Sequence, residues 1–429
     1  MQIRSSRDTQ SRPDMGVASR TFGALPASGL PASGSRPDVA ILIYDLRASG
    51  VVRNALRIAE CAAAAGLRCD VVVVQDEGDF RPCDCPHIRI VSLKTKASPN
   101  RFLGTLSATV PLRAYLRRYR PRVMFSAGNH IHPLAAMACF QLADAPRLVM
   151  RASNDITHAR RGGWESVLSR TLALSTRPLL RTMFARADRV VSVSEELASD
   201  LVRHLGLPRD NIVIIKNGID VGRIGQLARA EIDHPWFAPG APPVILGTGR
   251  LHRQKNFPLL IRAFARLRQR QAARLLILGT GPEETRQELL ALAASLGVGE
   301  DVELPGYVDN PFAYMRRAAL FVLSSSWEGM SNALLEAMAC GCPVVSTRCP
   351  TGTVEVLANG RYGPLVEIEN ADALADAMRW RLAQPRQSDR LVARAREYDL
   401  GRALAAYTDL LLEETRTQRD RPASLAQAA

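Results

Sequence analysis

The chain has 429 residues and an apolar fraction of 47%, values that fit a globular protein of two domains. No apolar run approaches the ~20 residues that span a bilayer, so the sequence excludes a transmembrane helix. The formal net charge is +14, and only four of the 56 cationic residues are lysines. A charge of this sign favours anionic partners, among them nucleic acid and membrane surfaces.

The arginines are concentrated in two segments of the first half. Residues 101–122 contain six arginines and no acidic residue, and residues 151–186 contain seven arginines and two acidic residues. Three interpretations fit such segments: a solvated basic face, a contact with an anionic membrane, and a nucleic-acid surface. Nucleic acid is the least favoured of the three, and the sequence leaves the other two open.

The ends of the chain and its cysteines carry little functional signal. Residues 1–37 repeat LPASG and lack the apolar core of a secretory signal, so we expect a disordered tail there and a second tail at residues 416–429. Eight cysteines without a signal peptide indicate a reducing compartment and free thiols. Cys83, Cys85 and His87 lack a second pair at zinc-finger spacing, and we expect an ordinary loop rather than a metal site.

Short apolar runs alternate with helical segments in the first half of the chain. Such alternation is typical of buried parallel strands covered by helices. The expected strands are residues 39–45, 71–74, 88–91, 123–126, 148–150 and 190–193, with helices that include 50–65, 133–142 and 194–204. We predict a Rossmann-like domain over residues 38–233 and a proline-rich linker at 234–243.

The same pattern restarts after the linker. The expected strands are residues 244–247, 275–278, 302–304, 320–323 and 343–346, and the helices between them are 258–270, 283–296 and 332–339. This indicates a second Rossmann-like domain over residues 244–399. The final helices have no strands between them, and the last, at residues 400–415, is a candidate to cross back to the first domain.

A basic, glycine-rich loop follows the first strand of the second domain. It contains Gly249, Arg250 and Lys255, and a second glycine-rich turn with Gly281 follows the next strand. Glycines let backbone amides approach a ligand, and a guanidinium with an ammonium suits two adjacent phosphates. Each loop alone also fits an ordinary strand-to-helix connection, so the sequence leaves both interpretations open.

Two glutamates belong to the strand–helix–strand step at residues 320–346. Glu328 lies in the turn and Glu336 one turn into the helix, so both can face the crevice beyond the strand ends. They either complement a helix dipole and face solvent, or accept hydrogen bonds from the vicinal hydroxyls of a sugar and a ribose. The amides then expected to donate to a diphosphate are those of Gly329, Met330, Ser331 and Asn332.

Several segments occur in an order that is characteristic of one family. They are GRLHRQKNFPLLIRAF, LILGTGPEE, LPGYVDNPFAYM, SSSWEGMSNALLEAMACGCPVV and GRYGPLV, preceded by RADRVVSVSEELASDL and IKNGID. Over residues 38–415 the chain resembles family 4 glycosyltransferases of the GT-B fold, whose most characteristic motif has the spacing of Glu328 and Glu336. The resemblance implies two Rossmann-like α/β domains with parallel sheets and an interdomain cleft.

The resemblance also implies an activity and the residues that carry it. It implies a retaining enzyme that moves a hexose or N-acetylhexosamine from a nucleotide-sugar, expected to be a UDP-sugar, without a metal or cofactor. Arg250 and Lys255 would clamp the diphosphate and stabilise the departing charge. Glu336 would bind the ribose and Glu328 the transferred sugar. The backbone expected to contact the base is that of Tyr307 and Val308.

The first domain departs from the family pattern at two places. Its first loop has Ser49 and Gly50 where the family often has two glycines. After the strand at 148–150 many members have a histidine, whereas this chain has the segment from Arg151 to Asn154. In this respect it resembles the subgroup that extends lipid-linked surface polysaccharide or glycan intermediates. The candidate acceptor or cleft residues are Gly50, His130, His132, Arg151 and Asn154.

We therefore predict a cytoplasmic glycosyltransferase, peripheral on the inner face of the cytoplasmic membrane, that elongates a lipid-linked saccharide. The expected partners are a nucleotide-sugar, the saccharide acceptor and an anionic membrane surface, with no nucleic acid. One alternative is a GT-B-fold nucleotide-sugar epimerase or phosphorylase, which would form product from the donor without a saccharide acceptor. A third is a basic nucleic-acid-binding protein, which would retain DNA or RNA near physiological salt with a steep salt dependence.

Overall fold

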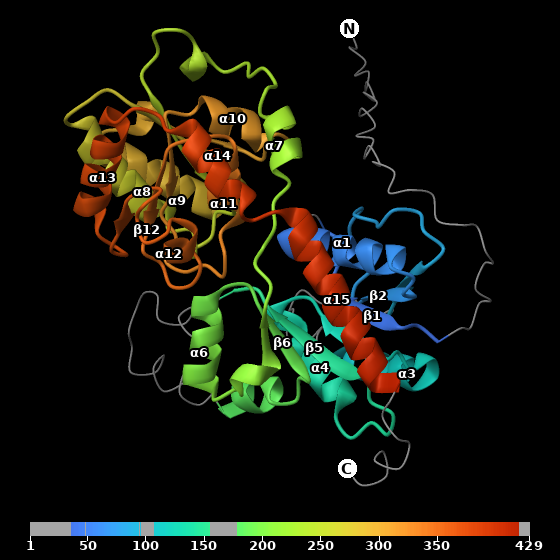
Figure 1. The fold of residues 1–429 in the computed structure, drawn as a ribbon. Coiled ribbons are helices and arrows are strands. Elements are labelled where there is room, and N and C mark those ends of the chain that lie inside the picture. Colours follow the sequence, from blue (N-terminus) through green and yellow to red (C-terminus); the bar gives the residue numbers. More distant parts are fainter. Residues whose placement is uncertain (1–35, 48, 94, 96–106, 155–177, 420–429) are drawn as a thin grey trace, which may run out of the picture.

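The computed structural model describes residues 36–47, 49–93, 95, 107–154 and 178–419. They form two α/β domains, each built on a parallel sheet (Figure 1). The predicted fold class is confirmed, because both sheets are parallel and helices connect their strands. Most of the expected first tail and of the arginine-rich segment 151–186 lies outside the described residues.

The first domain contains a seven-stranded sheet with the strand order β3-β2-β1-β4-β5-β6-β7. Its strands are β1 (Val39–Ile43), β2 (Cys69–Val73), β3 (Ile88–Ser92), β4 (Val123–Ser126), β5 (Arg147–Ala152), β6 (Arg189–Ser192) and β7 (Ile212–Ile214). Its helices include α1 (Gly50–Ala64), α3 (Thr109–Tyr119), α4 (His132–Cys139) and α6 (Glu195–Leu205).

Local chemistry explains where these elements begin. All five residues of β1 are buried, as a continuous apolar run in the middle of a parallel sheet requires. The Ser49 hydroxyl accepts a hydrogen bond from the amide of Val52 and starts α1, and Ser194 caps α6 in the same way through the amide of Leu197. Serine caps of this kind satisfy amides that have no partner inside the helix.

The second domain contains a six-stranded sheet with the order β10-β9-β8-β11-β12-β13. Its strands are β8 (Val244–Thr248), β9 (Arg274–Leu278), β10 (Val302–Gly306), β11 (Leu320–Leu323), β12 (Val344–Thr347) and β13 (Leu365–Val366). Its helices are α7 (Val221–Leu227), α8 (Phe257–Arg268), α9 (Glu283–Ser295), α10 (Pro311–Arg317), α11 (Asn332–Ala339), α12 (Thr353–Val356), α13 (Ala371–Ala383) and α14 (Ser388–Arg396).

The strand order of each sheet reverses beside its first strand. In the second sheet β8 lies between β9 and β11, so the chain continues to opposite sides of β8. Ligands of such sheets bind beyond the carboxyl ends of the strands at this point, because the helices that follow lie on opposite faces and leave a crevice. The loops there are residues 249–256 after β8 and residues 324–331 after β11.

Two segments cross between the domains side by side. Ile219 pairs with Asp399 in a parallel bridge, its amide donates to the carbonyl of Tyr398, and its carbonyl accepts from the amide of Leu400. A side chain at Gly218 would place its Cβ 2.5 Å from the Cα of Leu400, so only glycine permits this approach. Residues 234–243, expected as the linker, follow α7, which packs against α10, α11 and α14.

The last helix, α15 (Leu400–Arg419), lies along the first domain (Figure 1). It packs against α1, β4 and β5, and its Tyr407 ring contacts Phe125 edge to face. The buried carboxylate of Glu414 forms ion pairs with Arg147 and Arg189. Among the described residues, none of the helices is both long and apolar enough to cross a bilayer.

Candidate functional site

A buried ion pair joins the two loops at the strand-order reversal of the second sheet. The Lys255 ammonium donates to Glu328 Oε1 at 2.6 Å, and the Ser325 hydroxyl donates to the same oxygen at 2.7 Å. The side chains of Lys255 and Glu328 are only 16% and 8% exposed. A buried charge is costly unless it is paired and hydrogen-bonded, so each side chain holds the other in place.

Three glycines allow the loop that carries Lys255 to pack tightly. At Gly249 (φ +146°) a Cβ would lie 2.8 Å from the Lys255 Cε, and at Gly279 (φ +143°) it would lie 1.9 Å from the carbonyl oxygen of Gly249. At Gly281 it would lie 2.5 Å from the Leu251 Cβ. The two glycine-rich turns predicted separately therefore form one packed layer, and this layer positions Lys255.

The N-terminus of α11 lies beside this pair in the chain. Ser331 occupies the capping position but makes no capping hydrogen bond, and its buried hydroxyl has no hydrogen-bond partner among the described residues. The first amides of a helix also have no partner within it, and the helix dipole makes this end electropositive. The arrangement suits an anion with several acceptor oxygens, such as a phosphate.

Glu336 lies one turn further along α11 and is half-buried. Burial raises the pKa of this carboxyl, while Arg53, Lys255 and Arg57 oppose the rise through their positive charge. Arg53 and Arg57 belong to α1 of the first domain, so charges from both domains act on Glu336. These two arginines were not predicted from the sequence, although their spacing of four residues on the first helix places them on one face.

Three other predicted donor-site residues lie at the carboxyl ends of the strands. Arg250 is exposed in the loop after β8. Tyr307 is 66% exposed directly after β10, and Val308 beside it is half-buried. Strand β10 is at the edge of the sheet, two strands from β8. The structure thus brings Lys255 and Glu328 into contact and leaves Tyr307 and Val308 at the outer edge of the same sheet end.

The two candidate histidines of the first domain have different environments. His130 is exposed, and its ring contacts Tyr44 edge to face at 5.6 Å between centroids. His132 is fully buried, with Nε2 donating to the Arg151 carbonyl at 3.2 Å and Nδ1 accepting from the Ser126 hydroxyl at 2.8 Å. Burial lowers the pKa of His132 to about 3, so this ring is neutral at physiological pH.

The end of β5 touches the second domain. A Cβ at Gly329 would lie 2.1 Å from the Ser153 carbonyl oxygen, so the turn after Trp327 packs directly against the first domain. Gln254 is buried and donates to the carbonyl of Trp327 at 2.9 Å and to Asn154 Oδ1 at 3.4 Å. Candidate residue Asn154 therefore lies beside the loops that carry Lys255 and Glu328.

Asn129 fixes the position of the loop after β5. Its side-chain oxygen accepts from the Ser153 amide, and its side-chain nitrogen donates to the Asn154 carbonyl, both at 3.0 Å. Asn129 was not predicted from the sequence, although it is a polar residue shortly after the buried strand β4. Candidate residue Gly50 begins α1. Candidate residue Arg151 is buried, and its guanidinium faces Tyr407 and Asn217.

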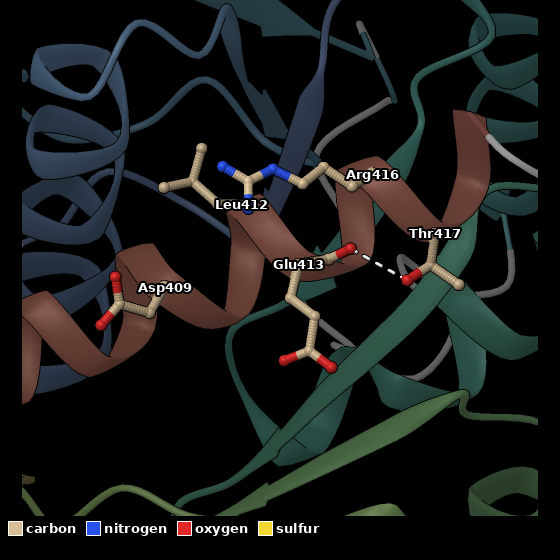
Figure 2. Close-up of a pocket in the computed structure, with 5 residues that line it drawn as sticks. All are labelled: Asp409, Leu412, Glu413, Arg416 and Thr417. Atoms are coloured by element: carbon tan, nitrogen blue, oxygen red, sulfur yellow. Dashed lines mark hydrogen bonds between the residues drawn. The ribbon is translucent and has the colours of Figure 1, made fainter.

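A groove of about 320 Å³ lies elsewhere, along one side of α15 (Figure 2). Residues of this helix alone line it: Asp409, Leu412, Glu413, Arg416 and Thr417. The Thr417 hydroxyl donates to the Glu413 carbonyl within the helix (Figure 2). Groups from different elements do not converge there, as they do around Lys255, and we do not assign a function to this groove.

Within the described part of the chain, no group of three or more histidine, cysteine, aspartate or glutamate side chains is placed to hold a metal ion. Cys83, Cys85 and His87 lie in the described range and form no such group.

Burial raises the pKa of Cys342 and Cys349 to about 12, so these thiols are protonated and unreactive at neutral pH.

Comparisons with known proteins define the class. A family model described as Glycosyltransferase Family 4 matches residues 48–223, and one described as Glycosyl transferases group 1 matches residues 242–384. The two matches follow the two domains and together cover most of the chain. The protein belongs to glycosyltransferase family 4, as the motif order had implied.

Curated relatives match about half of the chain. A 4-alpha-N-acetylgalactosaminyltransferase of Campylobacter jejuni, which acts on N-acetylgalactosamine-N,N'-diacetylbacillosaminyl-diphospho-undecaprenol, is 35% identical over 47% of this chain and 52% of its own length. The lipopolysaccharide core biosynthesis glycosyltransferase LpsE of Rhizobium meliloti is 34% identical over 55% of this chain and 66% of its own length. The matched part thus spans about half to two thirds of these relatives.

Solved structures share the whole fold at low sequence identity. Sucrose-phosphate synthase of Thermosynechococcus elongatus superposes with a TM-score of 0.75 at 20% identity, covering 89% of this chain and 100% of that one. WaaG, a glycosyltransferase involved in lipopolysaccharide biosynthesis, superposes with a TM-score of 0.67 at 20% identity, covering 87% and 99%. These matches and the two parallel sheets confirm the GT-B fold.

Proposed function

We propose that this protein transfers a hexose or N-acetylhexosamine from a nucleotide-sugar, with a UDP-sugar as the expected donor, to a lipid-linked saccharide. The observation that carries the proposal is the buried pair of Lys255 and Glu328 next to the N-terminus of α11, at the strand-order reversal of the second sheet. Family membership supports the reaction class, and the names of the two curated relatives support the acceptor class.

The donor diphosphate fits the electropositive end of α11. The Ser331 hydroxyl, which has no hydrogen-bond partner in the described part of the chain, and the first amides of the helix offer donors, and Lys255 and Arg250 supply positive charge. Glu336 lies one turn away and would accept hydrogen bonds from both hydroxyls of the ribose. Tyr307 and Val308, at the edge of the same sheet end, would contact the base.

Transfer breaks the bond between the anomeric carbon and the β-phosphate oxygen and forms a bond to an acceptor hydroxyl oxygen. The hydroxyl proton passes to the departing phosphate, so charge is conserved without an enzyme nucleophile. Attack on the face from which the phosphate leaves retains the anomeric configuration. Lys255 and Arg250 stabilise the charge that develops on the phosphate. Glu328 would hold the sugar and keep Lys255 oriented.

Fixed protein charges can take the place of a metal at the diphosphate. Lys255, Arg250 and the dipole of α11 already place positive charge there, which is the role of Mg²⁺ in many nucleotide-dependent enzymes. We therefore propose that transfer requires neither a metal nor another cofactor.

Protection against thermal unfolding by a panel of UDP-, GDP- and ADP-sugars tests the donor proposal. A ligand at 100 times its dissociation constant stabilises the folded state by about 2.7 kcal/mol, so one nucleotide series is expected to raise the melting temperature clearly. The increase should persist in EDTA. The matched control is Glu336→Gln, which should reduce the increase.

A panel that leaves the melting temperature unchanged would contradict the donor proposal. The products distinguish the alternatives. An isomerised sugar formed from the donor without acceptor would support an epimerase, and a sugar phosphate formed with phosphate would support a phosphorylase. Radiolabelled sugar that appears in the organic-soluble fraction only when a polyprenyl-diphosphate saccharide is present would support the proposed transfer.

A surface of the first domain suits a membrane-bound acceptor. Helices α3 and α4 pack against each other and contain no acidic residue. Together with the segment after residue 177 they present an arginine–apolar face, formed by Val110, Arg113, Arg117, Met137, Phe140 and Arg186. Val110 is 76% exposed on this face, and Phe140 is 44% exposed.

Side-chain contacts join the parts of the arginine–apolar face. The Arg113 guanidinium donates to the carbonyls of Phe140 and Gln141, and the Arg186 guanidinium lies 3.8 Å from the centre of the Phe140 ring. Apolar side chains among cations are typical of proteins that lie on anionic bilayers, where the apolar groups enter the interface and the cations meet headgroups. We propose that this face holds the protein on the cytoplasmic side of the membrane.

Reversing one charge on this face should weaken membrane binding. A cation near an anionic surface contributes about 1 kcal/mol, so Arg117→Glu should lower binding to vesicles containing anionic lipid by about tenfold or more. Phe140→Ser should lower it as well. Co-sedimentation with vesicles of phosphatidylglycerol and phosphatidylcholine measures the bound fraction.

Matched substitutions on the second domain serve as controls. Arg262 is an exposed arginine of α8 and Trp380 is a 56% exposed tryptophan of α13. Arg262→Glu and Trp380→Ser should leave vesicle binding unchanged. Equal effects of Arg117→Glu and Arg262→Glu would show that only the net charge of the protein matters. Vesicle binding by the wild type that does not depend on anionic lipid would show that this face does not bind membranes through its arginines.

A further inference from the structure

Arg151 connects three parts of the molecule that are distant in sequence. It is at the carboxyl end of β5 and only 5% exposed. Its Nε donates to the Tyr407 hydroxyl of α15 at 2.8 Å, and its Nη2 donates to Asn217 Oδ1 in the crossing segment at 2.7 Å. Both hydrogen bonds have good length, and the fork of the guanidinium sets their directions.

Asn217 extends this connection into the second domain. Its side-chain nitrogen donates to Asn332 Oδ1 at 2.9 Å and to the Met330 carbonyl at 3.4 Å. Asn332 is the first residue of α11, and Met330 precedes the capping position. A continuous set of hydrogen bonds therefore runs from Tyr407 through Arg151 and Asn217 to the N-terminus of α11.

The first-domain end of this set is rigid. The carbonyl of Arg151 accepts from the buried, neutral His132. The Tyr407 ring packs edge to face on Phe125 of β4, and Tyr407 is 2% exposed. Close backbone contact at Gly218 also holds the crossing segment against the start of α15. Movement of Asn217 relative to β5 would break its hydrogen bond with the buried guanidinium of Arg151, which is unfavourable.

We propose that Arg151 is a positioning residue that acts through Asn217 to hold the N-terminus of α11 in the geometry that binds a nucleoside diphosphate. The inference rests on the proposed function, since it concerns the same site. Arg151 does not touch the ligand in this role. This role differs from the one predicted from the sequence, which was acceptor binding, because the guanidinium of Arg151 already donates hydrogen bonds to Tyr407 and Asn217.

A lysine at position 151 would keep the charge but lose the fork. A single ammonium cannot reproduce two hydrogen bonds in fixed, divergent directions, so Arg151→Lys tests the geometry rather than the charge. Asn217→Ala breaks the same set one step later, and Tyr407→Phe removes only the hydroxyl while it keeps the ring packing. If Arg151→Lys fails to fold, these two variants still test the inference.

We expect each single variant to lose nucleoside diphosphate affinity, and we expect the losses of two variants not to add when they are combined. Binding of UDP, GDP and ADP is measured by calorimetry, and the nucleotide that the wild type binds best is used for all variants. Arg151→Lys and Asn217→Ala should each weaken its binding about tenfold, and the double variant should be no weaker than the worse single variant, because one break already releases α11.

Arg147 provides the matched control. It also lies in β5 and contacts α15, where it pairs with Glu414, but no hydrogen bond given by the structure links it to Asn217. Arg147→Lys should lower the melting temperature and leave nucleotide affinity unchanged. Additive losses in the double variant, or an equal loss of affinity in Arg147→Lys, would overturn the inference in favour of general destabilisation.

Hydrogen–deuterium exchange supplies a readout that needs no ligand. Peptides covering residues 326–339 should exchange faster in Arg151→Lys and Asn217→Ala than in Arg147→Lys or the wild type. Unchanged exchange in these peptides would overturn the inference even if the enzyme is a glycosyltransferase. Faster exchange in a protein that transfers no sugar would refute the proposed function and leave the link between Arg151 and α11 standing.

Discussion

Replacing Lys255 by methionine is expected to lower turnover by at least a hundredfold and to weaken donor binding much less. The ammonium lies in the loop after β8, at the end of the sheet where we place the donor diphosphate. Negative charge on the phosphate grows as the glycosidic bond breaks, so a fixed cation stabilises the transition state more than the bound donor. Loss of one such group typically costs a factor of ~10² to ~10³ in turnover. Steady-state kinetics with the donor found by thermal protection measure both quantities.

The same substitution leaves Glu328 buried without its partner. Breaking a buried pair typically costs about 3 to 5 kcal/mol of stability, so Lys255→Met should also melt at a lower temperature. The double variant Lys255→Met with Glu328→Gln removes the unpaired charge and should recover stability without recovering activity. Recovery of turnover in the double variant, or a Lys255→Met enzyme impaired in donor affinity alone, would contradict the role given to Lys255.

Replacing Glu336 by glutamine is expected to lower kcat/KM for the nucleotide-sugar by about ten- to a hundredfold. A charged acceptor contributes roughly 1.5 to 3 kcal/mol through its hydrogen bonds, and a neutral amide offers one acceptor and a pair of donors instead. The defect should be absent for a donor whose ribose lacks both hydroxyls, because that ligand makes no use of the carboxylate. A folded Glu336→Gln enzyme with full activity would refute the ribose assignment.

The protonation of Glu336 should make both donor affinity and folding stability depend on pH. Burial raises its pKa above the ordinary value of 4.5, and the carboxylate is the form that accepts from the ribose. Donor affinity should therefore fall as the pH decreases through this raised pKa, and Glu336→Gln should remove that part of the pH dependence. In the free protein the folded state binds the proton more tightly than the unfolded state, so stability falls as the pH rises through the same window. Glu336→Gln should then gain stability relative to the wild type above pH 4.5.

Most of the fold could be predicted from local patterns. The buried strands of a parallel sheet are continuous apolar runs, and the segments at 39–45, 123–126, 275–278 and 320–323 match β1, β4, β9 and β11 closely. Helices α3, α7, α10 and α12 were not among the elements predicted from the sequence. Several of these are short and carry no strong apolar period, so packing against neighbours decides whether they form.

The candidate site was predicted as separate parts. A basic loop and two acids after strands were visible, but Lys255 and Glu328 are 73 residues apart in the chain and meet only because β8 and β11 are neighbours in the sheet. Strand order follows from how the helices pack on the two faces, which local spacing does not encode. The contribution of Arg53 and Arg57 to the environment of Glu336 likewise depends on how the two domains meet.

The sequence by itself determined the family and the two parallel-sheet domains and supplied the candidate residues for the donor site, because ordered motifs and apolar periods are local properties. Only the tertiary structure decided where the guanidinium of Arg151 lies and what it contacts. In the sequence it follows a strand as a candidate acceptor residue, whereas in the folded protein α15 returns to the first domain and buries it between Tyr407 and Asn217. Burial and hydrogen-bond partners depend on contacts between residues that are far apart in the chain, and those contacts exist only once both domains and the crossing segments are in place.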